Sequence, residues 1–301
     1  MASTKIIDPN YGRGQHDLGE WLEEAGIIES KELVRRLLEV FRAPRYEPPV
    51  LPAVAIELHK LVRKSDVKFP AILSLLEKDP LIAGKVLRIA QSAFYARQAA
   101  VQSIEQALVR LGLSTLSQLF MEVSMRAKVF RAAGYEEPMR LLSRHSAATA
   151  HIARILCRRT SLYDEYAFLC GLLHDVGIAA SMIVLSQLPR GVKVPAFELV
   201  WPAIEEIHET ASGILCRSWK LPPDVALVVE HHHVPRIGGM IHPFAAALCV
   251  SDALASDLGY GLPHEQTRTG YDDALKALGL DKGAITSLLP DARAAVAHIE
   301  D

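Results

Sequence analysis

The chain has 301 residues and a mass of 33.1 kDa, which is enough for one large domain or two smaller ones. Half of the residues are hydrophobic and 23% are charged, and this composition excludes an intrinsically disordered chain. The net charge of -2 argues against direct binding to nucleic acid, because phosphate contacts require a basic surface.

The sequence predicts a cytoplasmic protein that does not enter a membrane. Its longest apolar runs, 179–185 and 245–250, are far shorter than the roughly 20 residues of a membrane span. Residues 1–20 contain no apolar core of a signal peptide. The four cysteines are widely spaced within apolar segments, so we expect reduced, buried thiols.

Apolar residues recur at helical spacing along almost the whole chain, which predicts an all-α fold, a multi-helical bundle with an N-terminal helical lobe. Asp79 and Pro80 form a typical helix start, with the aspartate as the cap. Ser103 opens another helix through a capping box, and Gly112 ends it. No segment alternates for long enough to predict a strand, and neither Asn-Gly nor Asp-Gly hairpin turns occur.

Shifts in composition divide the chain into four parts. Residues 1–45 form a helical lead, and residues 46–135 form a first helical lobe. A joint at 132–138 leads to a second lobe, residues 139–260. Residues 261–301 are predicted to add C-terminal helices.

Histidine is the residue whose distribution is uneven, and it gathers with aspartate in the second lobe. The cluster comprises His145, His174, Asp175, His208, the triplet His231–His233 and Asp252. These positions lie on separate predicted helices about 20 to 35 residues apart, so that each helix of a bundle can deliver one ligand to the core. Imidazole and carboxylate together suit Fe, Mn or Zn, and an aspartate can bridge two metal ions. A set of hydrogen-bonded core histidines is the alternative.

The segment Gly171-Leu172-Leu173-His174-Asp175-Val176-Gly177 resembles the signature of the HD superfamily of metal-dependent phosphohydrolases. Other segments resemble the HDOD proteins, a regulatory branch of that superfamily: 51–53, 79–93, 103–112 and 213–222. The resemblance covers roughly residues 46–255. It implies a bacterial, cytoplasmic protein of signal transduction.

The metal-ligand pattern is similar to that of the HD-GYP enzymes. The resemblance implies a set of ligands around one or two metal ions: His145, His174, Asp175, His208, His231, His232 and Asp252. The match within the triplet is ambiguous by one place, and His231 with His232 is the favoured pair. A lysine that contacts phosphate in the enzymes is replaced by Ile178, and 234–239 replaces their Gly-Tyr-Pro segment. Only a cation from elsewhere, such as Arg144 or Arg236, would compensate for that lysine.

We therefore expect a signalling or regulatory protein that holds a transition metal and binds a protein partner. The alternative is a metal-dependent phosphohydrolase acting on a phosphodiester or nucleotide, and a nucleotide ligand stays open. Glu205 lies one helical turn before His208, where its carboxylate either orients that imidazole or stays solvated. The apolar segments 94–96 and 116–120 are candidates for the partner surface or for a contact with the second lobe.

Overall fold

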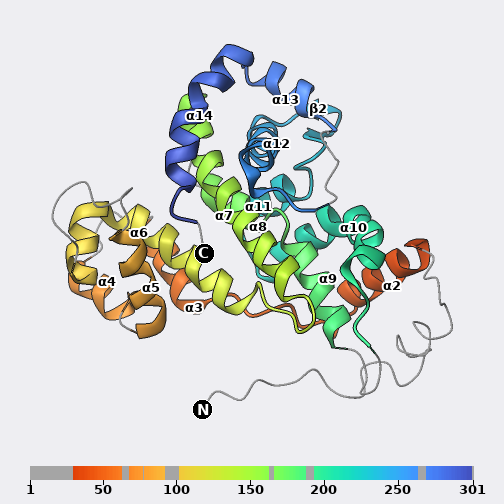
Figure 1. Cartoon of the computed structure of the whole chain (residues 1–301), viewed down its shortest axis with the longest axis horizontal. Coiled ribbons are helices and arrows are strands. Elements are labelled where there is room, and N and C mark those ends of the chain that lie inside the picture. The colour runs from red at the N-terminus through yellow and green to blue at the C-terminus, as the bar shows by residue number, and fades with distance from the viewer. Residues whose placement is uncertain are drawn as a thin grey trace.

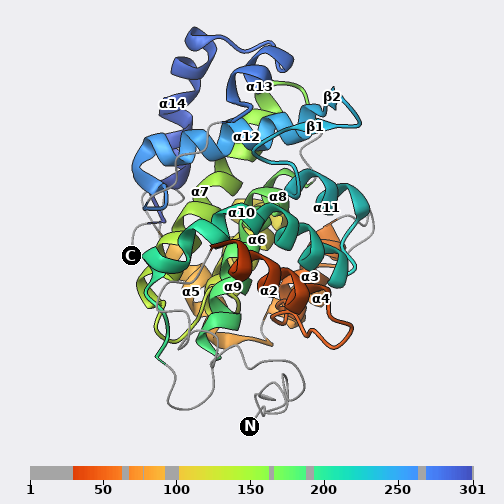
Figure 2. The same cartoon turned by 90° about the vertical axis from the view of Figure 1, so that its right-hand side faces the viewer.

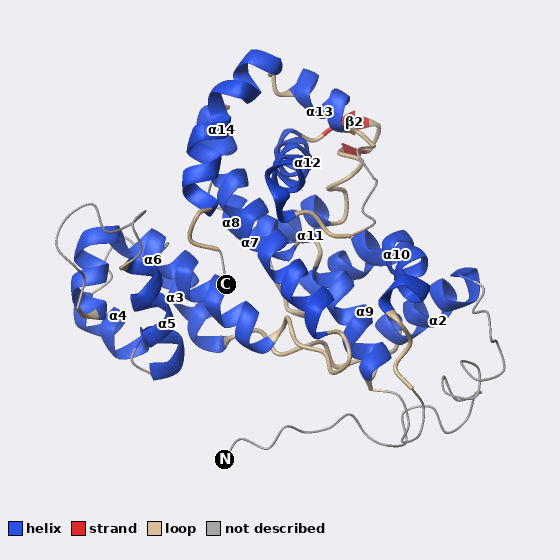
Figure 3. Cartoon of the chain, viewed as in Figure 1, coloured by secondary structure: helices blue, strands red, loops and turns tan. Residues whose placement is uncertain are grey.

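The computed structural model describes residues 30–62, 68–76, 78–91, 102–162, 166–187, 193–263 and 269–299. In this part of the chain the fold is all-α apart from one small hairpin, which confirms the predicted fold class (Figure 3). Its elements are α2 (Ser30–Arg42), α3 (Ala53–Val62), α4 (Phe69–Leu76), α5 (Pro80–Ala90), α6 (Ile104–Lys128), α7 (Glu136–Arg159), α8 (Ala167–Leu173), α9 (Val176–Ser186), α10 (Phe197–Ser218), α11 (Pro223–Val229), β1 (Arg236–Ile237), β2 (Met240–Ile241), α12 (Pro243–Ala255), the π-helical turn η1 (Ser256–Tyr260), α13 (Tyr271–Ala277) and α14 (Lys282–Val296).

Helices α3 to α6 form the first lobe around a core of their own, at one side of Figure 1. The predicted caps are present: Asp79 accepts a hydrogen bond from the Ile82 amide, and Ser103 accepts one from the Gln106 amide. Gly112 was predicted to end a helix, and its φ of +77° does interrupt the helical geometry there, but α6 continues beyond this kink. This kink allows both halves of α6 to line the same core.

The second lobe is built around two long helices, α7 and α10, as the perpendicular views show (Figures 1 and 2). Helices α8, α12 and α14 pack on α7, whereas α9, α11 and α2 pack on α10. Leu33, Leu37 and Phe41 of α2 are buried in the core of this lobe. The described end of the predicted N-terminal lead therefore shares the core of the second lobe.

The hairpin of β1 and β2 was missed by the sequence analysis. Its turn residues, Gly238 and Gly239, have φ of +58° and +83°, the left-handed region that a tight hairpin turn requires. The signal was therefore a Gly-Gly pair, which is a weaker hairpin signature than Asn-Gly.

The short helices α8 and α9 together form the most apolar stretch of the described chain. Residues Ala167–Ser186 reach a mean hydropathy of 2.0, which by length and composition would suit a membrane span. His174 and Asp175 interrupt this stretch in the sequence. It was therefore not counted among the apolar runs when we predicted that none is long enough for a membrane span. In the structure 89% of the window is buried inside the protein, as in the core helix of a globular domain.

Two further expectations concern surfaces and thiols. Leu116, Leu119 and Phe120 are buried in the first-lobe core, so the segment 116–120 directs its apolar side chains inward and provides no partner surface with them. Segment 94–96 lies outside the described residues. All four cysteines are buried and none is in a disulfide, as expected.

Candidate metal centre

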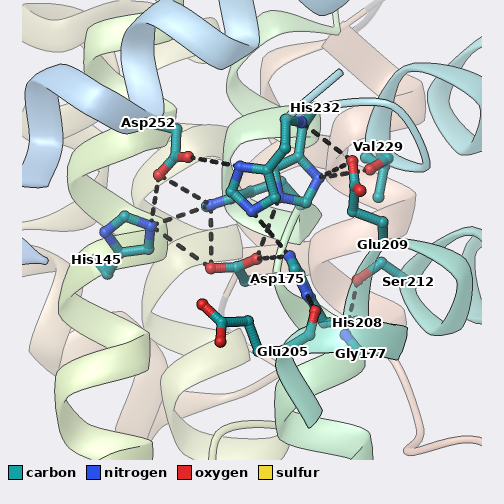
Figure 4. Close-up of polar contacts among 12 residues, drawn as sticks. His145, Asp175, Gly177, Glu205, His208, Glu209, Ser212, Val229, His232 and Asp252 are labelled. Atoms are coloured by element: carbon teal, nitrogen blue, oxygen red, sulfur yellow. Dashed lines mark hydrogen bonds and ion pairs between the residues drawn. The ribbon is translucent and has the colours of Figure 1, made fainter. Parts of the chain in front are cut away.

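Five segments of the second lobe bring histidine and aspartate side chains to one place (Figure 4). Helix α7 supplies His145, the junction of α8 and α9 supplies His174 and Asp175, and α10 supplies His208. The segment after α11 supplies two histidines of the triplet, and α12 supplies Asp252. The side chains that converge are those of His145, His174, Asp175, His208, His232, His233 and Asp252.

Two glycines allow the His174–Asp175 junction to lie this deep. A Cβ at Gly171 would lie 2.4 Å from the Ala150 Cα on α7, and one at Gly177 would lie 2.4 Å from the His208 carbonyl oxygen on α10. Only glycine permits such close approach of backbones. The Gly177 amide also donates a hydrogen bond to the Ser212 hydroxyl at 2.8 Å. The glycines of the HD-like segment thus bring α8 and α9 against the two long helices.

The imidazoles are oriented by main-chain carbonyl groups. Nδ1 of His174 donates to the Gly171 carbonyl at 2.8 Å, Nδ1 of His208 to Glu205 at 2.5 Å, and Nδ1 of His232 to Val229 at 2.7 Å. A carbonyl oxygen only accepts, so each Nδ1 carries the proton. In the neutral ring the Nε2 lone pair then faces the centre, the arrangement of a metal-ligating histidine.

Pairs of Nε2 atoms face each other across the centre. His145 and His174 approach to 3.1 Å, and His208 and His233 approach to 3.0 Å. Two neutral imidazoles cannot both present a lone pair at this distance without repulsion, so a proton or a metal ion must lie between or beside them. Among the described residues, the buried Nε2 of His232 and Oδ1 of Asp175 lack hydrogen-bond partners while lying 3.4 Å apart. The residues present therefore fit a metal ion.

Asp175 lies between two groups of histidines. Its Oδ2 is 3.2 Å from Nε2 of His174 and 3.5 Å from Nε2 of His145. Its Oδ1 is 3.4 Å from Nε2 of His232 and 3.6 Å from Nε2 of His208. Each carboxylate oxygen thus faces one half of the centre, the geometry of a carboxylate that bridges two metal ions.

The pKa values of the groups in the centre are shifted by burial and by the close approach of the histidines and aspartates. Burial opposes ionisation of Asp175, but His174 and His232 outweigh it and hold the pKa of this carboxyl well below its usual range. Burial lowers the pKa of His174, but the negative charges of Asp175 and Asp252 outweigh burial and raise it well above the usual value. Burial lowers the pKa of His233 well below the usual value, with a further contribution from His232. Without metal, the centre balances its carboxylates with protons on selected histidines.

The centre contains no lysine or arginine bonded to its aspartates: among the described residues, every ion-pair partner of Asp175 and Asp252 is a histidine. Ile178 is buried in the apolar core of the lobe. The guanidinium of Arg144 lies 5.4 Å from the centre of the Tyr260 ring, and Arg236 pairs with Asp273 at 2.7 Å. Both arginines that were considered as replacement cations thus make other contacts.

The expected ligand His231 does not join the cluster. Its Nδ1 donates to the Leu227 carbonyl at 2.9 Å, and the side chain is only partly buried. His233 takes its place, because the chain leaves α11 after Val229 and non-helical geometry turns the second and third histidines of the triplet inward. If α11 continued through the triplet, consecutive residues would point about 100° apart around the helix axis. The triplet follows the end of α11 and does not have this geometry.

The expected role of Glu205 also differs. Its main-chain carbonyl, rather than its carboxylate, is the group that accepts the hydrogen bond from His208. Sequence reasoning missed Glu209, whose Oε1 accepts a hydrogen bond from the His233 amide at 3.0 Å and lies 3.9 Å from Nδ1 of His232. Its position directly after His208 was the only signal for it.

Comparison with known proteins relates this chain to the HDOD domain family. The profile of the HDOD domain family matches residues 49–235, more than half of the chain. A protein of Treponema pallidum is 23% identical over 230 residues, which are 72% of this chain and 44% of that protein, so the chain spans less than half the length of this relative.

Three solved structures share the fold. A Shewanella amazonensis protein assigned as a metal-dependent phosphohydrolase has a TM-score of 0.68 at 18% identity, covering 90% of this chain and 99% of its own. An HDOD domain protein of Geobacter sulfurreducens has a TM-score of 0.65 at 20% identity, covering 89% and 97%. A protein of Marinobacter aquaeolei assigned to signal transduction has a TM-score of 0.61 at 22% identity, covering 90% and 64%.

Proposed function

The chain belongs to the HDOD family, and from its sealed His/Asp centre we propose that it is a cytoplasmic regulatory protein that binds transition metal and acts through a protein partner. The observation that carries the proposal is the closure of the centre. The seven converging residues are between 0% and 7% exposed. Structural metal sites are closed by their protein ligands, whereas catalytic sites keep a position open to substrate.

Two groups of residues would hold the metal. His145, His174 and Asp252 form one group, and the ligand atoms within it lie no more than 4.8 Å apart. The second group meets the same limit and consists of His208, His232 and His233. Asp175 lies between the groups, and imidazole with carboxylate favours Fe, Mn or Zn over Mg, which prefers oxygen ligands.

Metal-dependent phosphohydrolysis is the second candidate. Its support is the near-complete ligand set, together with the fold that the chain shares with the Shewanella protein. A bound metal would supply an activated water there. The remaining requirement is positive charge at the phosphoryl group, and Ile178 supplies none. Loss of one such contact typically lowers the rate on the order of 10²–10³-fold.

Metal content and turnover together test the proposal. Protein purified without chelator is analysed for metal and then, loaded with Fe²⁺ or Mn²⁺, is offered cyclic dinucleotides, nucleoside monophosphates and a chromogenic phosphodiester. We expect bound metal whose content is lower in His174→Ala/Asp175→Ala than in the native chain, with absent or feeble turnover. Absence of metal, both as purified and after reconstitution, would contradict the metal assignment.

Two further results separate regulation from catalysis. Multiple turnover that requires metal and disappears in Asp175→Ala would overturn the regulatory role in favour of the phosphohydrolase. An increase of a weak rate in Ile178→Lys would support the view that the missing cation limits catalysis. A pull-down from the source organism with the full chain, compared with His174→Ala/Asp175→Ala, then tests whether a protein partner depends on the metal.

A further inference from the structure

A second group of buried metal-ligating side chains lies where three distant segments meet. Glu122 comes from α6 of the first lobe, His151 from α7, and His298 from the segment that follows α14. In Figure 1 this last segment descends from α14 toward α6 and α7. None of the three residues contributes to the metal centre described above.

The three side chains direct ligand atoms at one point. Nε2 of His151 is 3.0 Å from Oε2 of Glu122, and Nε2 of His298 is 3.6 Å from the same oxygen. The two imidazole rings lie nearly perpendicular, at 89°, with centroids 4.8 Å apart. Ligands bound at about 2.0–2.2 Å in tetrahedral geometry lie about 3.3–3.6 Å from each other, so little movement is needed to admit an ion.

The surroundings favour a cation at this point. The side chains of Glu122, His151 and His298 are 10%, 2% and 1% exposed. A carboxylate buried to this extent is costly unless positive charge compensates for it. Phe168 packs its ring against His151 with centroids 5.1 Å apart and excludes solvent on that side.

The helices that carry the group are also fixed in relative position. One turn along α7 from His151, Arg154 donates a hydrogen bond to Gln118, which lies one turn before Glu122 on α6. This neighbouring contact holds α6 and α7 at the separation that the Glu122–His151 pair requires. Such prior arrangement lowers the entropic cost of assembling a ligand set.

We propose that Glu122, His151 and His298 form a second metal site, which binds one divalent transition-metal ion. Two imidazoles and one carboxylate are a ligand set suited to Zn²⁺ or Fe²⁺. The ion joins the first lobe to the second and fastens the C-terminal segment to both. The site is independent of the metal centre, so either assignment can fail without the other.

The test counts metal in a chain whose first centre has been removed. His174→Ala/Asp175→Ala/His233→Ala protein, in which both groups of the first centre lack ligands, is stripped with chelator, reconstituted with Zn²⁺, desalted and analysed for zinc. We expect about one zinc per chain, lost when Glu122→Gln or His298→Gln is added and retained with the control changes Glu105→Gln or His231→Gln. Zinc should raise the melting temperature of the parent variant and the controls, but not that of the two ligand variants.

Unchanged zinc content in both ligand variants would overturn the proposal, as would absence of zinc from the parent variant. The three residues would then be an ordinary buried hydrogen-bonded group. If the parent variant does not fold, Glu122→Gln and His298→Gln are placed in the otherwise native chain. Each should then hold about one equivalent less zinc than the native protein, and an equal content would refute the site.

Discussion

At the scale of single residues, the metal centre depends on which side of the main chain each histidine faces. His231, His232 and His233 are consecutive, yet only the last two reach the centre. His233 faces His208 at 3.0 Å, while the ring of His231 is held by the Leu227 carbonyl. Neighbours in sequence thus have different chemical surroundings.

This difference provides a matched pair of variants. We expect His233→Ala to weaken metal binding by at least about tenfold, because it removes a ligand, whereas His231→Ala should bind as the native protein does. Titration calorimetry of chelator-treated protein with Zn²⁺ measures both affinities. A loss confined to His231→Ala would instead support the ligand pair inferred from the sequence.

Protons are expected to compete with metal at the same residues. In the metal-free protein burial lowers the pKa of His174, but Asp175 and Asp252 outweigh burial and raise it well above its usual value, so this histidine keeps its proton to a higher pH than an ordinary imidazole. A metal ion binds the deprotonated imidazole, so metal binding must release protons. The measured binding enthalpy at pH 7 should vary with the ionisation enthalpy of the buffer. An enthalpy equal in phosphate and Tris would contradict the charge state inferred here.

At the scale of elements, the centre requires α8 and α9 to lie unusually close to α7 and α10. Gly177 is the residue on which the contact with α10 depends, since a Cβ there would meet the His208 carbonyl at 2.4 Å and the Ser212 amide nitrogen at 2.8 Å. Backbone atoms cannot move aside as a flexible side chain can. The helix that carries Asp175 would have to shift away from the helix that carries His208.

We therefore expect Gly177→Ala to lower the free energy of unfolding by about 1–3 kcal/mol and to weaken metal binding. Gly84→Ala is the control, because nothing lies within 4 Å of a Cβ at that exposed helical position. This change should raise the free energy of unfolding by about 0.5–1 kcal/mol, the usual gain of alanine over glycine in a helix. Urea denaturation of the chelator-treated proteins measures both effects. Equal effects of the two changes would show that close packing at Gly177 is unimportant.

At the scale of the whole molecule, the metal centre and the first lobe have separate cores. Most buried apolar residues of α3 to α5 pack with α6. The second lobe has its own core around α7 and α10, which Ala55 of α3 and Met121 and Met125 of α6 also join. Bound metal stabilises the folded state of the part that holds it. The consequences of metal removal should therefore be local.

Hydrogen exchange measures this directly. In Glu122→Gln protein, which lacks a ligand of the proposed second site, we expect chelator treatment to give faster exchange in α7 to α12 and little change in α3, α4 and α5, since the stability of a protein varies between its cooperative units. The control is the same variant with His174→Ala/Asp175→Ala/His233→Ala added, in which the chelator should change nothing at the first centre. Equal acceleration in both lobes would mean that they unfold as one unit.

The all-α fold, the caps at Asp79 and Ser103, the break in helical geometry at Gly112 and membership of the HDOD family could all be predicted from the sequence. These features follow from local periodicity and from short motifs, which act over one or two helical turns. The sequence also placed His145, His174, Asp175, His208, His232 and Asp252 in one group, because each lies in a segment with a recognisable pattern.

Three features depend on the three-dimensional packing: which histidine completes that group, which oxygen of Glu205 contacts His208, and the meeting of Glu122, His151 and His298. The reason is physical. The direction of a side chain after a helix end depends on the local main-chain turn, for which hydrophobic periodicity gives no signal. The meeting of α6, α7 and the C-terminal segment depends on packing between residues up to 176 positions apart, such as Glu122 and His298.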